Sequence, residues 1–252
     1  MPLLELRHIT KSYPHSKGTL RVIEDLSFAV EEGEFVAIVG PSGCGKSTLL
    51  RIINGIVPLT SGQVLYKGRQ VDGINLECAL VFQSFALMPW LTVEDNIEMP
   101  LEALGIAPAE RRKRASFYID KVGLDGFEEA YPRELSGGMK QRVGLARALA
   151  VEPRVLMMDE PFSALDALTA ISLREELLDI WRLPDTPVHT ILLVTHIIEE
   201  AIELADRVLV LSSGPGRLLA DLRIDLPRPR DRRSEAFNAF TDKVFSLIEE
   251  RN

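Results

Sequence analysis

One short segment limits what this chain can fold into more than any other feature. Residues 40 to 48 read GPSGCGKST, which matches the pattern GxxxxGK followed by Ser or Thr of a phosphate-binding loop. Glycines let the backbone curl so that its N–H groups point inward and bind phosphate oxygens. Lys46 adds a positive charge, and the Ser47 hydroxyl can bind a magnesium ion. The pattern predicts that a nucleoside triphosphate binds to Gly40, Pro41, Ser42, Gly43, Cys44, Gly45, Lys46, Ser47 and Thr48.

The residues on both sides of this loop predict the structure around it. Glu34 to Val39 form a short apolar run that is typical of a buried strand. Lys46 to Asn54 have the pattern of a helix, and Gly55 is expected to end it. A strand, a glycine loop and a helix in this order place the positive end of the helix dipole beneath the phosphates.

Apolar periodicity and turn residues predict strands and helices along the rest of the chain. Leu3 to Ile9, Val22 to Val30 and Gln63 to Tyr66 alternate apolar and polar residues, which indicates a partly antiparallel sheet. A charged helical insert is expected between Thr92 and Gly123. Strands and helices then alternate, which predicts a mostly parallel sheet. We expect helices at 139–150, 168–181 and 199–205, strands at 154–158, 189–194, 207–211 and 218–224, and a final amphipathic helix.

The composition is that of an ordinary globular protein. The chain has 252 residues, of which 46% are hydrophobic and 26% charged, and its formal net charge is -8. This negative charge disfavours a nucleic-acid partner, whose binding surface is usually basic. Cys44 and Cys78 have no metal-ligand spacing, which favours a reducing cytoplasm. The N-terminus has no secretory pattern, and the apolar stretches are too short to cross a bilayer, so we expect any membrane role to come through a partner.

Two carboxylates follow a run of four apolar residues. Residues 155 to 158 are apolar, and Asp159 and Glu160 come directly after them. Ligands bind at the carboxyl ends of strands in open parallel sheets. Asp159 is therefore predicted to hold a magnesium ion and Glu160 to polarise the attacking water. The alternative interpretation is a strand that ends in a solvated acidic turn.

A second anion site is predicted between the helical insert and this strand. Ser136, Gly137 and Gly138 stand at the start of a helix, where a serine cap and glycines expose backbone N–H groups. One chain would then carry two phosphate-binding devices. This makes sense if two copies meet head to tail and enclose ATP between the loop of one copy and the helix start of the other.

With these motifs, the chain resembles the ATP-binding cassette family almost from end to end. Tyr13 resembles the aromatic residue that stacks on adenine, with a strand-edge tyrosine as the alternative. Gln83 resembles the glutamine that links the metal and water to the transporter contact. Asp166, in the segment 163–166, resembles the residue of a loop that couples the two ATP sites of a dimer. His196 resembles the switch histidine that contacts the terminal phosphate.

This resemblance implies an α/β fold in one nucleotide-binding domain, residues 1–252. It implies a P-loop NTPase core with a mixed, mainly parallel sheet and an N-terminal antiparallel β subdomain (1–87 and 147–225). It also implies a helical insert that carries the signature motif (88–146), and a C-terminal basic turn and helix (226–252). The implied cofactors are ATP and Mg²⁺, with Ser47, Gln83 and Asp159 at the metal and with Glu160, His196 and Gln83 as catalytic residues.

Within the family, the resemblance is to ATPase subunits of nitrate, sulfonate and taurine importers. It depends on the segments 87–96, 131–132, 214–217 and 227–232. It implies a dimer that works with transmembrane permease subunits, and indirectly with a solute-binding protein, on the cytoplasmic face of the membrane. One residue departs from the pattern, because Ile197 stands where such ATPases generally carry an aspartate after the histidine. A helix cap or local hydrogen bond is therefore in doubt.

Several alternatives remain open on the sequence alone. The chain could power export or lipid trafficking, or be a non-transport ATPase that acts on DNA or ribosomes, although it lacks the long coiled coil, zinc cysteines or fused second cassette of such proteins. The apolar run Phe85 to Trp90 could be core or a groove that receives a permease helix. The basic clusters 111–114 and 228–233 could be solvated surface or contact anionic lipids.

Overall fold

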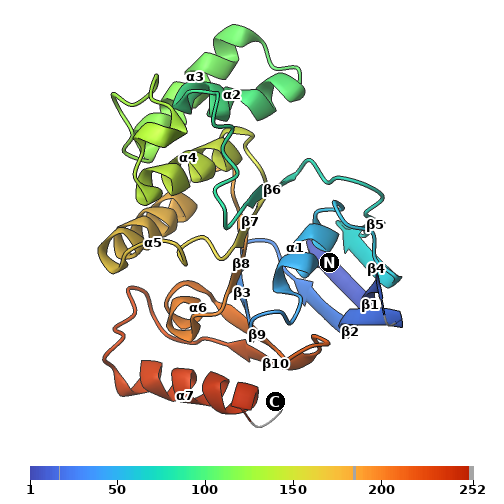
Figure 1. The fold of residues 1–252 in the computed structure, drawn as a ribbon. Coiled ribbons are helices and arrows are strands. Elements are labelled where there is room, and N and C mark those ends of the chain that lie inside the picture. Colours follow the sequence, from blue (N-terminus) through green and yellow to red (C-terminus); the bar gives the residue numbers. More distant parts are fainter. Residues whose placement is uncertain (17, 184–185, 250–252) are drawn as a thin grey trace. The chain divides into compact units, whose positions relative to one another are not determined.

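The computed structural model describes residues 1–16, 18–183 and 186–249, and it divides into two compact units (Figure 1). Unit 1 comprises Met1–Asn75 and His189–Asn252, and unit 2 comprises Leu76–Val188. The subdomain bounds that we expected from the sequence remain a prediction.

Unit 1 begins with an antiparallel sheet of strand order β2-β1-β4-β5. Its strands are β1 (Leu4–His15), β2 (Gly18–Val30), β4 (Ser61–Tyr66) and β5 (Arg69–Gln70). The first strand runs six residues beyond the predicted end at Ile9. The register of β1 against β2 shifts between Leu6 and Ile9, where His8 has a φ of 51°. This bulge interrupts the apolar alternation, which explains why the pattern hides the second half of the strand.

The phosphate-loop segment of unit 1 is built on parallel strands. The strand β3 (Phe35–Val39) pairs in parallel with β8 (Thr190–Thr195) and with β9 (Arg207–Leu211), and β10 (Leu218–Arg223) pairs antiparallel with β9. All residues of β3 and β8 are buried, as expected for a parallel sheet that is covered on both faces. The helices of this unit are α1 (Lys46–Ile53), α6 (Ile198–Leu204) and α7 (Glu235–Glu249).

Unit 2 combines a parallel strand pair with the helical insert. The strands β6 (Cys78–Val81) and β7 (Val155–Asp159) pair in parallel. The helices are α2 (Val93–Ala103), α3 (Pro108–Lys121), α4 (Gly137–Ala150) and α5 (Ala167–Arg182), with a 3-10 turn η1 at Pro132–Glu134. Helices α2, α3 and α4 pack against one another in pairs (Figure 1).

The mixed α/β class with an antiparallel β region and a helical insert is confirmed. Apart from β1 and β2, which are longer than expected, element ends move by no more than one or two residues. Thr92 begins α2 as predicted, since its side chain accepts from the Asp95 backbone N–H at 3.1 Å and forms a capping box. Helices α4 and α5 begin one or two residues earlier than the apolar pattern indicates. Their caps, Ser136 and Asp166, are polar and so lie outside that pattern.

Candidate functional site

The predicted phosphate loop connects β3 to α1 in unit 1, and glycines give it its shape. Gly43 and Gly45 have φ angles of 80° and 101°, in the range that favours glycine. A Cβ at Gly45 would lie 2.9 Å from Cγ1 of Val22 and 3.0 Å from Cγ1 of Ile23. A side chain at this position is therefore excluded both by backbone strain and by space.

The Lys46 ammonium lies within the phosphate loop. Lys46 is 4% exposed, and its Nζ donates to the carbonyl oxygens of Gly40 at 2.8 Å and Pro41 at 3.1 Å. Helix α1 starts at Lys46 with no acidic residue in its first turn, so its dipole adds to the positive charge. Backbone N–H groups, an ammonium and a helix N-terminus together make an anion-binding cradle.

The predicted hydrolysis residues of unit 2 come together at the end of β7. Asp159 is the last residue of the strand and is 4% exposed. Glu160 follows with a φ of 48°, a left-handed conformation that is strained for a residue with a Cβ. The Gln83 Nε2 donates to Glu160 Oε2 at 3.3 Å and to Ser163 Oγ at 3.5 Å. The Ser163 hydroxyl in turn donates to the Glu160 carbonyl oxygen at 2.9 Å.

The second predicted anion site lies at the start of α4. The Ser136 Oγ accepts from the Met139 backbone N–H at 3.3 Å, so this serine caps its own helix. Nothing lies within 4 Å of a Cβ built on Gly137, whereas a Cβ on Gly138 would lie 2.4 Å from Cγ2 of Thr169. The backbone at Gly137 is thus open to a ligand, and Gly138 is required for close packing against α5.

Asp166 lies close to this helix start through the same threonine. Its side chain accepts from the Thr169 backbone N–H at 3.1 Å and from the Thr169 hydroxyl at 2.6 Å. These hydrogen bonds lower the pKa of Asp166. The residue therefore remains ionised at the N-terminus of α5, where its charge also stabilises the helix.

The region after β8 in unit 1 shows how the chain accommodates Ile197. His196 is exposed, and Ile197 stands at the N-cap of α6 without a side-chain cap. Its backbone N–H instead donates to Oγ1 of Thr195 at 3.0 Å, and that hydroxyl donates to the buried Glu200 carboxylate at 2.8 Å. Sequence reasoning missed Thr195 and Glu200. The sequence signal that could have indicated them is the threonine directly before His196 and a glutamate in the first turn of α6.

Tyr13 lies in β1 of unit 1 and is half-buried. The Lys11 ammonium lies 4.5 Å from its ring centroid and donates to the Pro58 carbonyl oxygen at 2.7 Å. A cation–π contact of this kind holds the ring in a defined orientation. Stacking on adenine remains a prediction for this residue.

The interpretation of Phe85 to Trp90 as core is wrong, because Trp90 is 70% exposed and the other residues of the run are half-buried or exposed.

In the two basic clusters, several arginines bind other groups of the chain, which favours a structural role for them over contact with lipids. Arg228 donates to Asp206 at 2.5 Å, Arg230 donates to backbone carbonyl oxygens, and Arg114 pairs with Glu110 and Glu152 at 2.9 Å each.

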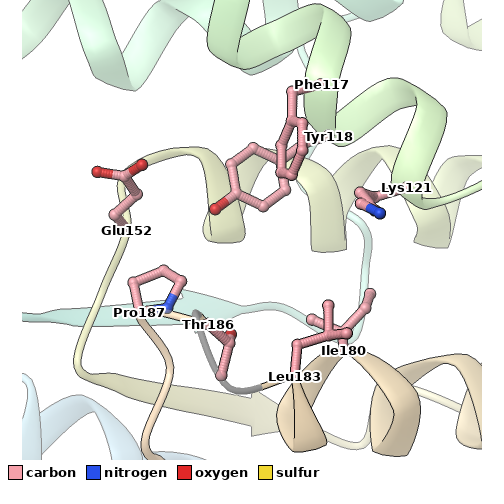
Figure 2. Close-up of a pocket in the computed structure, with 8 residues that line it drawn as sticks. All are labelled: Phe117, Tyr118, Lys121, Glu152, Ile180, Leu183, Thr186 and Pro187. Atoms are coloured by element: carbon pink, nitrogen blue, oxygen red, sulfur yellow. The ribbon is translucent and has the colours of Figure 1, made fainter.

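Unit 2 also contains a cavity of about 300 Å³ between α3, the end of α5 and the turn after α4 (Figure 2). Tyr118 lies between Glu152 and Lys121, and its hydroxyl points toward the side where Glu152 lies (Figure 2). Burial and the Glu152 carboxylate raise the pKa of Tyr118 to about 12. The lining holds no predicted site residue: it consists of Phe117, Tyr118, Lys121, Glu152, Ile180, Leu183, Thr186 and Pro187.

Comparison with known proteins defines the class. The family model for ABC transporter matches residues 23–163. The chain is 44% identical to the nitrate import ATP-binding protein NrtD of Synechocystis over 98% of its length and 96% of that protein's. It is 41% identical to the aliphatic sulfonates import ATP-binding protein SsuB of Bacillus cereus, over 98% and 96% of the two chains.

A solved structure agrees with these matches. The ATP-binding cassette MJ0796, a dimer in a post-hydrolysis state bound to ADP and Pi, superimposes with a TM-score of 0.78 at 31% identity, covering 89% of this chain and all of that one. The chain therefore belongs to the ABC transporter family. It is an ATPase of that family, with the P-loop NTPase fold.

None of the helices within residues 1–16, 18–183 and 186–249 is long and apolar enough to cross a membrane. Across the same described ranges, no group of three or more His, Cys, Asp or Glu side chains has the geometry to hold a metal ion.

Proposed function

We propose that this chain hydrolyses ATP to ADP and phosphate to power a separate transmembrane permease. The observation that carries the hydrolytic part is the arrangement of Gln83 and Glu160 at the end of β7. The strand is buried, the left-handed turn at Glu160 places its carboxylate at the carboxyl edge, and the amide of Gln83 fixes it. A carboxylate that is held in this way can accept a proton from an attacking water.

ATP is bound by the phosphate loop in this proposal. The backbone N–H groups of residues 40–48 and the Lys46 ammonium bind the β- and γ-phosphates, and the two carbonyl oxygens that Lys46 now contacts give way to phosphate oxygens. Tyr13 stacks on adenine, and His196, which is exposed, binds the terminal phosphate. The contacts from the loop, Lys46 and His196 stabilise the negative charge that the phosphates carry.

The proposed donors for Mg²⁺ are Ser47, Gln83 and Asp159. They fit this ion, because hydroxyl, amide and carboxylate oxygens are the hard ligands that magnesium prefers, and because it keeps several waters when it is bound to nucleotide. The buried Asp159 carboxylate supplies the negative charge. When bound, the ion neutralises charge on the phosphate oxygens.

Two copies of the chain form the working unit in this proposal. Ser136, Gly137 and Gly138 of one copy bind the ATP that the phosphate loop of the other copy holds, and Asp166 couples the two sites. The dimeric MJ0796 structure and the open backbone at Gly137 support the assignment. In the ATP-bound dimer, the Ser136 hydroxyl exchanges its cap on Met139 for a phosphate oxygen.

The proposed partner is a permease that imports a small anion such as nitrate, a sulfonate or taurine, supplied by a solute-binding protein. The similarity to NrtD and SsuB supports this choice. The chain would sit on the cytoplasmic face of the membrane, where the exposed Trp90 enters the permease interface as an aromatic anchor. Trp90→Ala and Met88→Asp should spare ATP binding and weaken permease association, which a pull-down of purified components measures.

The experiment for the proposed function uses purified Glu160→Gln protein and light scattering. The variant should bind ATP, lack turnover, and accumulate as an ATP-bound dimer. A mixture of Ser136→Arg and Lys46→Ala chains tests the shared site, because the pair retains one intact composite site. Glu160→Gln protein that stays monomeric at saturating ATP would contradict the dimer model.

A further inference from the structure

The segment that follows Gln83 is held by a side chain of α4. Arg147 donates from Nη1 to the Ala86 carbonyl oxygen at 2.6 Å and from Nη2 to the Phe85 carbonyl oxygen at 2.9 Å. All three residues belong to unit 2. One planar guanidinium thus binds two successive carbonyl groups, which a lysine cannot do because its ammonium is a single point of charge.

The two carbonyl groups belong to strained residues. Phe85 and Ala86 have φ angles of 61° and 49°, in the left-handed region that is costly for residues with a Cβ. Such a conformation persists only where surrounding contacts enforce it. Helix α4 approaches closely one turn earlier as well, since a Cβ on Gly144 would lie 3.5 Å from the Phe85 carbonyl oxygen.

The far end of the same segment is held by a residue of α2. The Asn96 side chain is fully buried and accepts from the Met88 backbone N–H at 2.8 Å. Its amide donates to the carbonyl oxygens of Met88, Leu91 and Thr92 at 3.2, 3.1 and 2.8 Å. Trp90 lies between these two attachments and is 70% exposed.

We propose that Arg147 and Asn96 are positioning residues that join segment 85–92 rigidly to α4 and α2. The inference rests on the proposed function, because it explains how a partner that contacts Trp90 acts on Gln83. Helix α4 also begins at the Ser136 cap. The same helix therefore carries the proposed ATP contact at one end and holds the segment beyond Gln83 at the other.

The first test uses tryptophan fluorescence and does not depend on catalysis. In a Trp181→Phe background, the anisotropy and acrylamide quenching of Trp90 report the mobility of the segment. Arg147→Met should lower the anisotropy and increase the quenching, and Arg147→Lys should give intermediate values. Arg142→Met is the matched control on α4, because Arg142 binds the Val122 carbonyl oxygen and Glu176, away from the segment. It should leave Trp90 unchanged.

The second test asks whether Arg147 acts through Gln83. Arg147→Met should lower kcat on the order of tenfold, as expected for a misplaced group, with KM for ATP unchanged. In a Gln83→Ala background the same substitution should change kcat less than about twofold, because coupled residues are not additive. Equal losses in both backgrounds, or a raised KM, would overturn the proposal.

Further outcomes distinguish a variant that does not fold, a failure of the proposed function and a failure of the positioning role. If Arg147→Met does not fold, Arg147→Lys decides, and a lysine variant with wild-type anisotropy and kcat would overturn the proposal. An inactive wild-type chain would contradict the proposed function, whereas Trp90 anisotropy that is unchanged in Arg147→Met would contradict the positioning role alone.

Discussion

The two units hold their site residues by different means. In unit 1, the left-handed positions of the phosphate loop are glycines, Gly43 and Gly45, and the loop needs no strained side-chain residue. In unit 2, the turns beside the predicted catalytic groups place Phe85, Ala86 and Glu160 in the left-handed region. Non-glycine residues there cost on the order of 1–2 kcal/mol each.

The difference indicates different tasks. A glycine loop lets the backbone itself approach phosphates, so it is suited to binding. A turn of larger residues keeps side chains at fixed positions but must be enforced by its neighbours, as Arg147 and Asn96 enforce segment 85–92. Strain stored at such turns is typical of catalytic and switching segments. The comparison therefore predicts that substitutions at glycines of unit 1 affect affinity, and that substitutions in the turns of unit 2 affect turnover or stability.

A large effect on ATP binding is expected at Gly45. Gly45→Ala should reduce ATP affinity by more than about tenfold, because the left-handed backbone penalises alanine and the Cβ meets Val22. Gly43→Ala is the matched control, since its φ is also positive but nothing lies within 4 Å of its Cβ. It should lose less affinity. Isothermal titration with ATP measures both, and equal affinities for the two variants would refute the steric part of the argument.

An alkaline titration sharpens the comparison in unit 2, where another left-handed turn places Glu152 (φ 53°) near Tyr118. Burial and this carboxylate raise the pKa of Tyr118 from 10 to about 12. The folded state therefore holds the phenol proton more tightly, so this contribution to stability is complete below pH 10 and is lost as the pH rises toward 12. The loss should be about 2 to 3 kcal/mol.

Tyr118→Phe isolates this contribution from the other groups that titrate in the same range. The unfolding free energy of the wild type minus that of Tyr118→Phe, measured with urea from pH 9 to pH 11.5, should fall as the pH rises. A difference that is independent of pH would show that the phenol is not perturbed.

The smallest effect is expected at Ala86. Ala86→Gly should raise the free energy of unfolding by up to about 1 kcal/mol, because relief of the left-handed strain exceeds the added entropy of the unfolded chain. Ala239→Gly, at an exposed position inside α7, is the control and should destabilise by about 0.5–1 kcal/mol. Urea unfolding shows whether each variant raises or lowers the free energy of unfolding. Destabilisation by both variants would show that Ala86 is not strained.

The sequence was most informative where backbone geometry demands a particular residue type. The glycines of the phosphate loop, the acids after β7 and the capping threonine of α2 each require a specific chemistry, and the pattern predicted the strand–loop–helix order around them. Tertiary contacts to backbone carbonyls leave no such signal. Arg147 could not be predicted, because any residue offers the carbonyl oxygens that it binds.

Two other features show what a local pattern omits. The run that ends at Trp90 is apolar, and periodicity does not distinguish a buried run from one that Asn96 holds at the surface. At Ile197, the departure from the family pattern put a helix cap or local hydrogen bond in doubt. The structure replaces it through Thr195 and Glu200, which are brought together by the start of α6.

The central claim is that unit 1 supplies binding through Lys46 and that unit 2 supplies the base through Glu160. The most direct test measures ATP affinity and steady-state hydrolysis for Lys46→Ala and Glu160→Gln side by side. Lys46→Ala should lose both affinity and turnover. Glu160→Gln should keep the affinity while hydrolysis slows by at least the ~10²-fold that is typical of general-base loss. Near wild-type turnover by Glu160→Gln, or equal loss of affinity in both variants, would contradict the claim.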